Sequence, residues 1–227
     1  MIRTLAAAAA FVDDAGLALL FPKADIVLPS LWEQVAGEQE VRWPSPPMEF
    51  LWGAKDELPA QGLVCVGRHV GRVVACVAPR LVPVLAAANG DAADDDPVSE
   101  AVRELGPLTG PQLREATGLP KKEVDRRVAA LHHRIVLTSS HLVEQNGPWG
   151  ALAHDLVARK WRLPATLPPR DEARRELAAL VLETAGELTA ADLGGALGWR
   201  RKEAAAVLDE IAEGRDDEAG FRIWARR

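Results

Sequence analysis

The sequence predicts a mainly α-helical fold with small β-hairpins, an α+β class built from tandem winged-helix domains. The main observation is an internal repeat at an offset of 80 residues without a gap, in which residues 108–123 lie over residues 188–203. Each copy reads as a Thr-capped short helix, a glycine turn and a second helix that begins with paired basic residues, which is the pattern of a helix-turn-helix. A strand-like run follows the helices in each copy, at 135–143 and at 221–224, and would supply the hairpin of a winged helix.

The first segment, residues 1–92, is predicted to be an N-terminal helical domain with a β-hairpin. Ser30-Leu-Trp-Glu33 forms a capping box, so a helix is expected over 31–36. β-branched residues around a glycine-containing turn predict the hairpin. The other expected elements are a helix over 3–15, a strand-like run at 17–21, a short helix at 48–54, hairpin strands at 63–67 and 72–77, and a helix that ends near Asn89. Because helices followed by a hairpin are also the contents of a winged helix, a divergent third copy is the alternative.

A polar stretch rich in aspartate, from Asn89 to Pro97, is the best candidate for a domain boundary. After it, residues 98–165 are predicted to form the middle winged-helix domain, and residues 170–227 the third. The middle domain is expected to contain helices at 98–105, 110–117 and 121–133, a strand at 135–143, a wing tip at 144–148 and a helical or extended segment at 151–161. The third domain repeats this plan, with a helix at 171–185, the repeated helix pair and the terminal strand.

Composition indicates a soluble globular protein with a substantial core. The chain has 227 residues, of which 48% are hydrophobic, and no run approaches the roughly 20 apolar residues that span a bilayer. We therefore expect a cytoplasmic location and no membrane partner. Cys65 and Cys76 are expected to be small buried residues rather than a disulfide. No histidine or cysteine spacing of a metal site and no phosphate-binding glycine loop occurs, so neither a metal nor a cofactor is expected.

The charge distribution indicates that the middle domain contacts nucleic acid. The whole chain carries a net charge of −6, yet residues 98–165 carry 10 Lys and Arg against 7 Asp and Glu. In a helix-turn-helix the second helix places its first residues near base edges and phosphates. We therefore expect double-stranded DNA as the partner, bound mainly by the middle domain. The residues assigned to DNA binding are Lys121, Lys122, Arg126, Arg127, the wing-tip residues Gln145 and Asn146, and Arg200, Arg201 and Lys202 of the third domain.

The third-domain helix is the weaker candidate of the two copies. Beyond its basic start, its outward residues include Glu203, Asp209, Glu210 and Glu213, and these would repel a phosphate backbone. Winged helices also act as dimerisation modules and spacers. A protein-interaction scaffold without nucleic-acid binding therefore stays open as an alternative, and so does a homodimer.

Three tryptophans concentrate in the first domain, at Trp32, Trp43 and Trp52. Together with nearby polar groups they could hold a flipped base. Core positions are the preferred interpretation, because large aromatic side chains dominate the interior of small domains.

Two stretches of the first domain resemble a known family. Residues 16–32, Gly-Leu-Ala-Leu-Leu-Phe-Pro-Lys-Ala-Asp-Ile-Val-Leu-Pro-Ser-Leu-Trp, and residues 55–59, Lys-Asp-Glu-Leu-Pro, look like the bacterial proteins described as AlkZ-related, and the resemblance covers most of the chain in plan. It implies tandem winged helices and a place in DNA repair, since AlkZ-type DNA glycosylases excise alkylated bases and some of them unhook interstrand crosslinks. A DNA glycosylase is therefore the alternative function.

The catalytic signature of that family is a glutamine, an apolar residue, then glutamine or aspartate, which positions the attacking water. This sequence lacks the signature, because no glutamine is followed two positions later by glutamine or aspartate. No catalytic residue is therefore carried over from the family. Asp25 and Glu33 are the candidates to replace the missing carboxylate.

Overall fold

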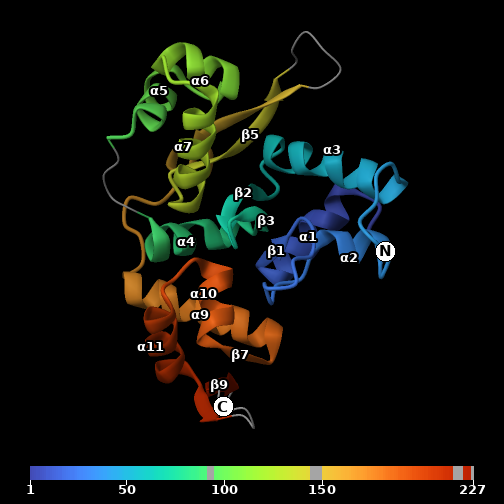
Figure 1. The fold of residues 1–227 in the computed structure, drawn as a ribbon, viewed down its shortest axis with the longest axis vertical. Helices are drawn as coiled ribbons and strands as arrows, with labels where there is room; N and C mark the ends of the chain where they lie inside the picture. Colours follow the sequence, from blue (N-terminus) through green and yellow to red (C-terminus); the bar gives the residue numbers. More distant parts are fainter. Residues whose placement is uncertain (91–94, 144–149, 217–221, 226–227) are drawn as a thin grey trace.

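The structure, a computed structural model, describes residues 1–90, 95–143, 150–216 and 222–225 (Figure 1). The first group of elements, called the first unit, runs from α1 to β3, and a short 3-10 turn with a helix follows it. These elements are α1 (Leu5–Ala15), β1 (Leu17–Leu19), α2 (Leu31–Ala36), α3 (Pro46–Ala60), β2 (Cys65–Val70), β3 (Val73–Val77), the 3-10 turn η1 (Pro79–Leu81) and α4 (Val82–Asn89).

Two further groups follow along the chain, called the middle and third units. The middle unit consists of α5 (Pro97–Leu105), β4 (Leu108–Thr109), α6 (Gly110–Thr117), α7 (Lys121–His133), β5 (Leu137–Val143) and β6 (Ala151–Leu156), and is followed by the short helix α8 (Val157–Lys160). The third unit consists of α9 (Arg170–Ala185), β7 (Glu187–Thr189), α10 (Ala190–Leu197), α11 (Arg201–Ile211), β8 (Glu213–Asp216) and β9 (Arg222–Ala225).

All three units share one order of elements: helix, strand, helix, helix, strand, strand. Their antiparallel sheets also share one strand order, β1-β3-β2, β4-β6-β5 and β7-β9-β8, with the last strand in the centre. The predicted mixture of helices with small antiparallel sheets is therefore confirmed. The first unit has the same plan as the other two, although its sequence does not align with the 80-residue repeat.

Local chemistry explains why the second helix of each unit starts where it does. Capping boxes open α2, α6 and α10, and pair Ser30 with Glu33, Thr109 with Gln112, and Thr189 with Asp192. Each box satisfies amide groups that a helix leaves unpaired at its first turn. Gly118 and Gly198 end α6 and α10 in the left-handed conformation, at φ 67° and 75°, which an L-residue with a side chain rarely adopts.

The structure departs from the sequence-based prediction in several elements. Helix α3 spans residues 46–60 rather than 48–54, because Ser45 caps it and prolines occupy its first positions. The segment 151–161 divides into β6 and α8. Strand β8, Glu-Gly-Arg-Asp, was not predicted, since it lacks the alternation of apolar residues that marks a half-buried strand.

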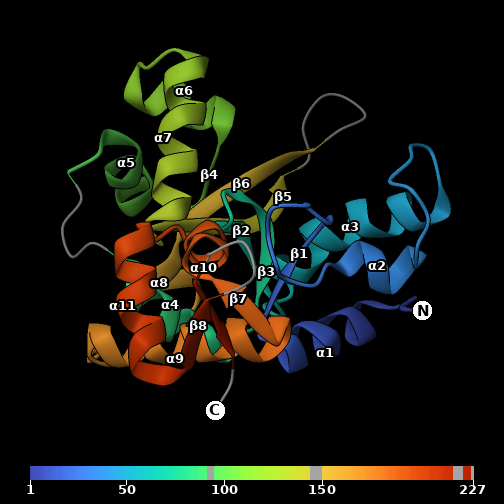
Figure 2. The same ribbon diagram turned by 60° about the horizontal axis from the view of Figure 1, so that its bottom comes forward.

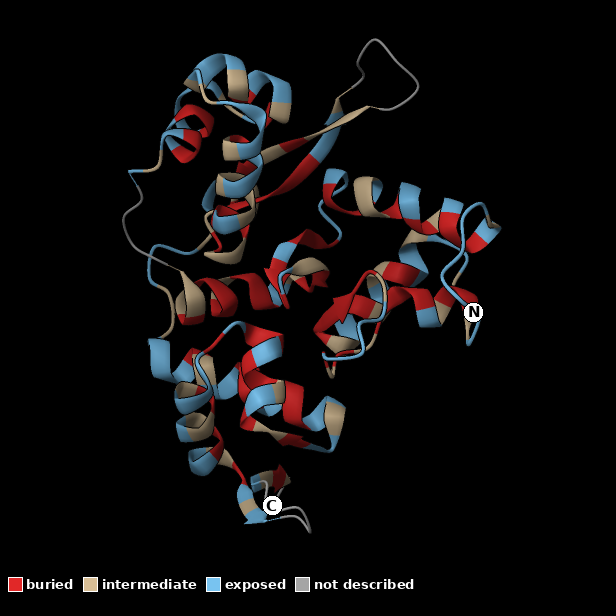
Figure 3. Cartoon of the chain, viewed as in Figure 1, coloured by how far each residue is buried: buried red, intermediate tan, exposed pale blue. Residues whose placement is uncertain are grey.

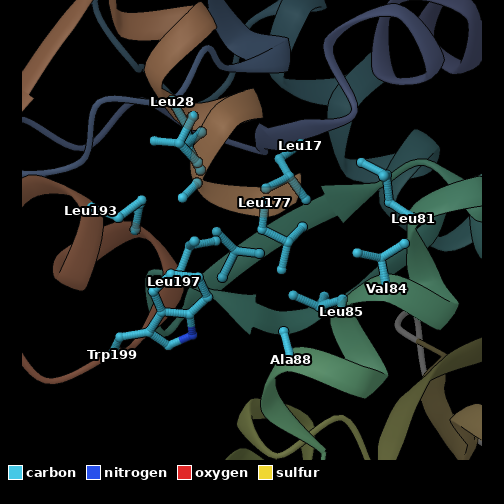
Figure 4. Close-up of a cluster of buried hydrophobic side chains, with 14 of the residues drawn as sticks. Leu17, Leu28, Leu81, Val84, Leu85, Ala88, Leu177, Leu193, Leu197 and Trp199 are labelled. Carbon is cyan, nitrogen blue, oxygen red and sulfur yellow. The ribbon is translucent and has the colours of Figure 1, made fainter. Parts of the chain in front are cut away.

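Three hydrophobic clusters form the interior, and Figure 3 shows which segments of the chain are buried. One lies within the first unit around Trp32 and Leu51, and another lies within the middle unit around Leu113 and Leu131. The largest cluster joins the first and third parts of the chain: Leu17, Leu28, Leu81 and Leu85 pack with Leu177, Leu193, Leu197 and Trp199 (Figure 4).

Hydrogen bonds reinforce the contact between these distant segments. Asn89, at the end of α4, donates to the Leu197 carbonyl at 3.1 Å and accepts from the Trp199 indole at 2.6 Å. The Gly71 amide, in the turn between β2 and β3, donates to the Ala196 carbonyl at 2.8 Å. The β2–β3 hairpin is thereby attached to helix α10. Within the described part of the chain, no helix is long and apolar enough to cross a membrane.

Candidate nucleic-acid interface

Helix α7 presents the basic residues that the repeat pattern singled out. Lys121, Lys122 and Arg126 are exposed. Lys121 lies 2.6 Å from the Asp125 carboxylate, and Arg126 donates two hydrogen bonds to Glu123, which lower the pKa of Glu123 to about 2. Exposed ion pairs of this kind contribute little to stability, so their cations can exchange a carboxylate partner for a phosphate.

Arg127 has a different position from its neighbours. Its guanidinium bonds to Glu123 at 2.7 Å and to Asp96 at 2.6 Å, and Asp96 caps the start of α5 through the Val98 amide. Arg127 therefore joins α7 to α5 inside the middle unit, and its charge is directed toward the protein.

The remaining predicted DNA contacts are distributed unevenly. Arg200, Arg201 and Lys202 are exposed at the start of α11, and Arg201 lines a cavity described below. Gln145 and Asn146 lie outside the described residues.

A chain of basic side chains runs between the middle and third units, along the β2–β3 hairpin. One cavity, of about 410 Å³, is lined by Arg68, Arg72 and Arg134 with Ala129, Ala130 and His133 of α7. A second, of about 340 Å³, shares Arg72 and is lined by Lys23, Asp25, Arg201 and the glycines around α10. We call Lys23, Arg68, Arg72, Arg134 and Arg201 the arginine band.

The arginine band concentrates positive charge in an acidic protein. Its five cations face one lining carboxylate, Asp25, whereas the whole chain has a net charge of −6. Arg68, Arg72 and Arg201 have no ion-pair partner among the residues that the structure describes. Exposed cations that lie close together raise the local positive potential and attract anions.

The hairpin holds two of these arginines in place. Gly71 and Arg72 both have positive φ, 59° and 56°, as in the tight two-residue turn that matches the twist of antiparallel strands. The hairpin contacts α7 on one side and α10 on the other, and Figures 1 and 2 show it between these helices. Sequence reasoning missed Arg68 and Arg72, although the signal was present: two arginines within an otherwise apolar hairpin.

Next to the arginine band, three histidines from different segments come together. The rings of His69 and His132 stack at 5.4 Å, and His132 meets His154 edge-on at 5.1 Å. Burial lowers the pKa of His69 and of His154 to about 4 and the pKa of His132 well below its ordinary value. The three rings are therefore neutral at neutral pH, and they lie where β2, α7 and β6 meet.

The two carboxylates proposed as replacements for the catalytic signature are not brought together. Glu33 accepts hydrogen bonds from the Ser30 amide and hydroxyl, both at 2.8 Å, so it is occupied by the helix cap. Asp25 is exposed, lies 3.1 Å from Lys23 and lines one cavity of the arginine band.

The expectation that the three first-domain tryptophans are core residues is correct for one and wrong for two. Trp32 is buried and donates to the Gln39 carbonyl at 2.8 Å. Trp43 and Trp52 are 52% and 43% exposed and pack edge-on at 6.2 Å. Each indole covers part of the other, and the Lys55 ammonium lies over the Trp52 ring at 4.5 Å. These local contacts shield the two rings partly from water, although neither ring lies in the core. Cys65 and Cys76 are free and buried, as predicted.

The fold and the arginine band leave the class of protein open. Comparison with known proteins indicates a DNA repair-related protein and suggests DNA as its substrate. The chain belongs to the AlkZ-like family, whose model is described as DNA glycosylase AlkZ-like and matches residues 72–225. The match extends from the turn of the β2–β3 hairpin to β9. No curated protein and no solved structure matches the chain.

Proposed function

We propose that this protein binds double-stranded DNA along the arginine band and the adjoining exposed face of α7. The observation that carries the proposal is a pair of arginines, Arg68 and Arg72, that lie on a hairpin between α7 and α10 and find no ion-pair partner in the described part of the chain. Phosphate groups are the natural partners of such a row, because each neutralised phosphate releases counterions from the duplex. Membership of a family described as DNA glycosylase AlkZ-like supports the choice of DNA.

The proposal includes the winged-helix interpretation of the units. Residues 98–165 and 170–227 are taken as winged-helix domains and residues 1–92 as a divergent third, because the three units share one element order and one strand order. In this arrangement α7 is the helix that approaches the major groove. We further propose that the protein acts in the cytoplasm.

The test is fluorescence anisotropy with a labelled duplex over a range of salt concentrations. Replacing Arg68 and Arg72 with glutamine removes two phosphate contacts, so the slope of log K against log salt should fall by about 2. Glutamine can take the place of Arg72 without adding backbone strain, since both residues carry a side chain at the same positive φ.

A matched control makes the same change in net charge at a site outside the arginine band. Arg175 and Arg215 are exposed and pair with Glu210 and Glu187, outside the arginine band. Replacing both with glutamine should leave the slope unchanged. Equal slopes for the two double variants would refute binding along the band.

A second test separates α7 from the hairpin. Lys122 and Arg126 are exposed on α7, and replacing both with glutamine should weaken duplex binding, whereas the middle unit should fold as before.

Absence of binding to any duplex at low salt would instead favour a protein-interaction scaffold, and analytical ultracentrifugation would then decide whether the chain forms a homodimer.

Base excision is the second candidate function, favoured by the family match. Of the two candidate carboxylates, only Asp25 lines a cavity of the arginine band. The prediction is that D25N abolishes release of methylated bases from duplex DNA while E33Q acts through the helix cap and mainly lowers stability. No release by the unaltered protein, at high concentration and from methylated or crosslinked duplex, would remove this candidate.

A further inference from the structure

A cavity of about 470 Å³ lies where helix α4 meets the middle and third units, and it shares no lining residue with the arginine band. We call it the junction groove. It is lined by Arg103 of α5, by Arg170 of α9, and by apolar residues of α4, of the turn after α7, of β6 and α8, and of the segment 163–168. Its volume is within the range of ligand sites.

The walls of the junction groove are apolar side chains that the fold leaves partly uncovered. Ala87, Leu163 and Leu167 pack against the large cluster that joins the first and third parts of the chain. Val136 and Leu156 pack against the cluster of the middle unit, and all five side chains are half-buried. The groove is therefore the seam between two hydrophobic cores, where apolar groups of a partner would be removed from water.

The two arginines give the junction groove a single sign of charge. Neither Arg103 nor Arg170 forms an ion pair with a residue that the structure describes, and no acidic residue lines the groove. Arg170 Nε donates to the Ala88 carbonyl at 3.1 Å, whereas its terminal nitrogens donate to no described residue. A guanidinium group with free terminal nitrogens matches a carboxylate, so charge complementarity indicates an acidic occupant.

The backbone that carries Arg103 is fastened to the middle unit. Arg159 of α8 donates to the Val102 carbonyl at 2.9 Å, and the Asp155 carboxylate accepts from the same side chain at 2.7 Å. The end of α5 is thereby attached to α8 on the other side of the groove. A site that is formed before its occupant arrives loses less free energy to ordering on binding.

The segment along one wall favours a peptide over a fatty carboxylate. Residues 163–168, Leu-Pro-Ala-Thr-Leu-Pro, belong to no helix or strand. The backbone amides of Thr166 and Leu167 donate no hydrogen bond to a described residue. Such amides pair with the carbonyl groups of an extended peptide, whereas an acyl chain offers them no acceptor.

We propose that the junction groove docks an extended peptide segment of another protein, in which two carboxylates precede apolar side chains. The carboxylates pair with Arg103 and Arg170, and the apolar side chains fill the space between α4 and α8. The main chain of the peptide accepts hydrogen bonds from the segment 163–168. This surface is separate from the arginine band, so the peptide and duplex DNA bind independently of each other.

The test is fluorescence anisotropy with a labelled peptide, Gly-Asp-Asp-Ala-Leu-Leu, and with its counterpart in which asparagine replaces both aspartates. The first peptide should bind saturably, and the second roughly tenfold more weakly. Replacing Arg103 and Arg170 with glutamine should weaken binding of the first peptide by a similar factor. Ala158 lines the groove from an exposed position on α8, so A158W should fill the groove, abolish peptide binding and leave duplex affinity unchanged.

The matched control is again the replacement of Arg175 and Arg215 with glutamine, which removes the same charge away from the groove. It should leave peptide affinity within about twofold. Equal losses in the two double variants would overturn the proposal, and so would peptide binding that survives A158W or that depends on Arg68 and Arg72 instead.

Two further outcomes would also overturn it. One is no binding of the peptide at millimolar concentration. The other is saturable binding of dodecanoate without binding of the peptide, which would assign the groove to a lipid. Duplex binding by the same variants is measured separately, so the proposed DNA binding stands or falls by its own result.

Discussion

At the scale of single residues, the buried histidines make stability depend on pH. An unfolded histidine has a pKa near 6.5, whereas burial holds the pKa of His69 at about 4 in the folded chain. The unfolded state therefore binds more protons as pH falls from 6.5 to 4, and stability is lost over this window. His69 alone should account for about 3 kcal/mol. Urea denaturation at pH 7 and pH 4.5 measures the difference, and His69→Gln should reduce it. Equal stability at both pH values would contradict the prediction.

A second prediction at this scale separates Arg127 from its neighbours. Arg127→Ala removes the bond that joins α7 to Asp96 and should lower the free energy of unfolding measurably, because that bond links two helices. Lys122→Ala is the matched control, because Lys122 is exposed and should change stability by less than about 0.5 kcal/mol. Thermal unfolding of both variants is the measurement, and equal losses would show that the Asp96 bond contributes nothing.

Single-residue roles were only partly predictable from sequence. The basic start of α7 follows from the repeat, yet nothing local distinguishes Arg126, on the surface, from Arg127, which bonds to a residue on another helix. His69 and His154 lie far apart along the chain, and each contacts His132 only through tertiary structure. Contacts of this kind have no signature in a single sequence.

At the scale of elements, two equivalent glycines allow a matched comparison. Gly118 and Gly198 both end the first helix of a helix pair in the left-handed conformation. A Cβ at Gly118 would meet open space, whereas a Cβ at Gly198 would collide with the His133 imidazole. Gly118→Ala should therefore cost about 1 kcal/mol, for backbone strain alone, and Gly198→Ala clearly more.

Urea denaturation of the two alanine variants measures this difference. The comparison is informative because the two glycines occupy equivalent positions of the repeat and share nearly the same φ. Equal losses of stability would mean that His133 can move away from Gly198, and that the contact between the middle and third units at this point is loose.

Elements with strong end signals were the ones that sequence predicted well. Helices α2, α6 and α7 have the predicted bounds, since capping residues and glycine or proline mark their ends. The short strands β4, β7 and β8 were missed. Each is too short, or too polar, to show periodicity, and each forms by pairing with the central strand of its sheet.

At the scale of the whole molecule, the large cluster predicts that the first and third units share their stability. Leu177 of α9 packs in this cluster, and Leu113 packs in the middle unit. Each Leu→Ala change should cost roughly 2–5 kcal/mol. L177A should lower hydrogen-exchange protection in β1 and β3 as well as in α9, whereas L113A should lower it mainly in α5 and α7. Protection of β1 and β3 that is unaffected by L177A would contradict a shared core.

The sequence did not reveal this shared interior. Apolar periodicity shows which face of an element is buried, but it does not show which other element packs against that face. The aspartate-rich stretch around residues 91–96 suggested a boundary, and the division into 1–92, 98–165 and 170–227 stays a prediction. Helix α4 lies directly before that stretch and packs on α9. It is therefore adjacent to the middle unit along the chain but packs against the third unit in space.

The joining of Leu17 and Leu81 with Leu177 and Trp199 also has a consequence for synthesis on the ribosome (Figure 4). The N-terminal side of this cluster is made well before its C-terminal side. At about 5–20 residues per second, the delay is on the order of ten seconds. During that interval the nascent chain exposes an apolar surface whose partner has not yet been translated, so this part of the core can close only after α9 and α10 have been made.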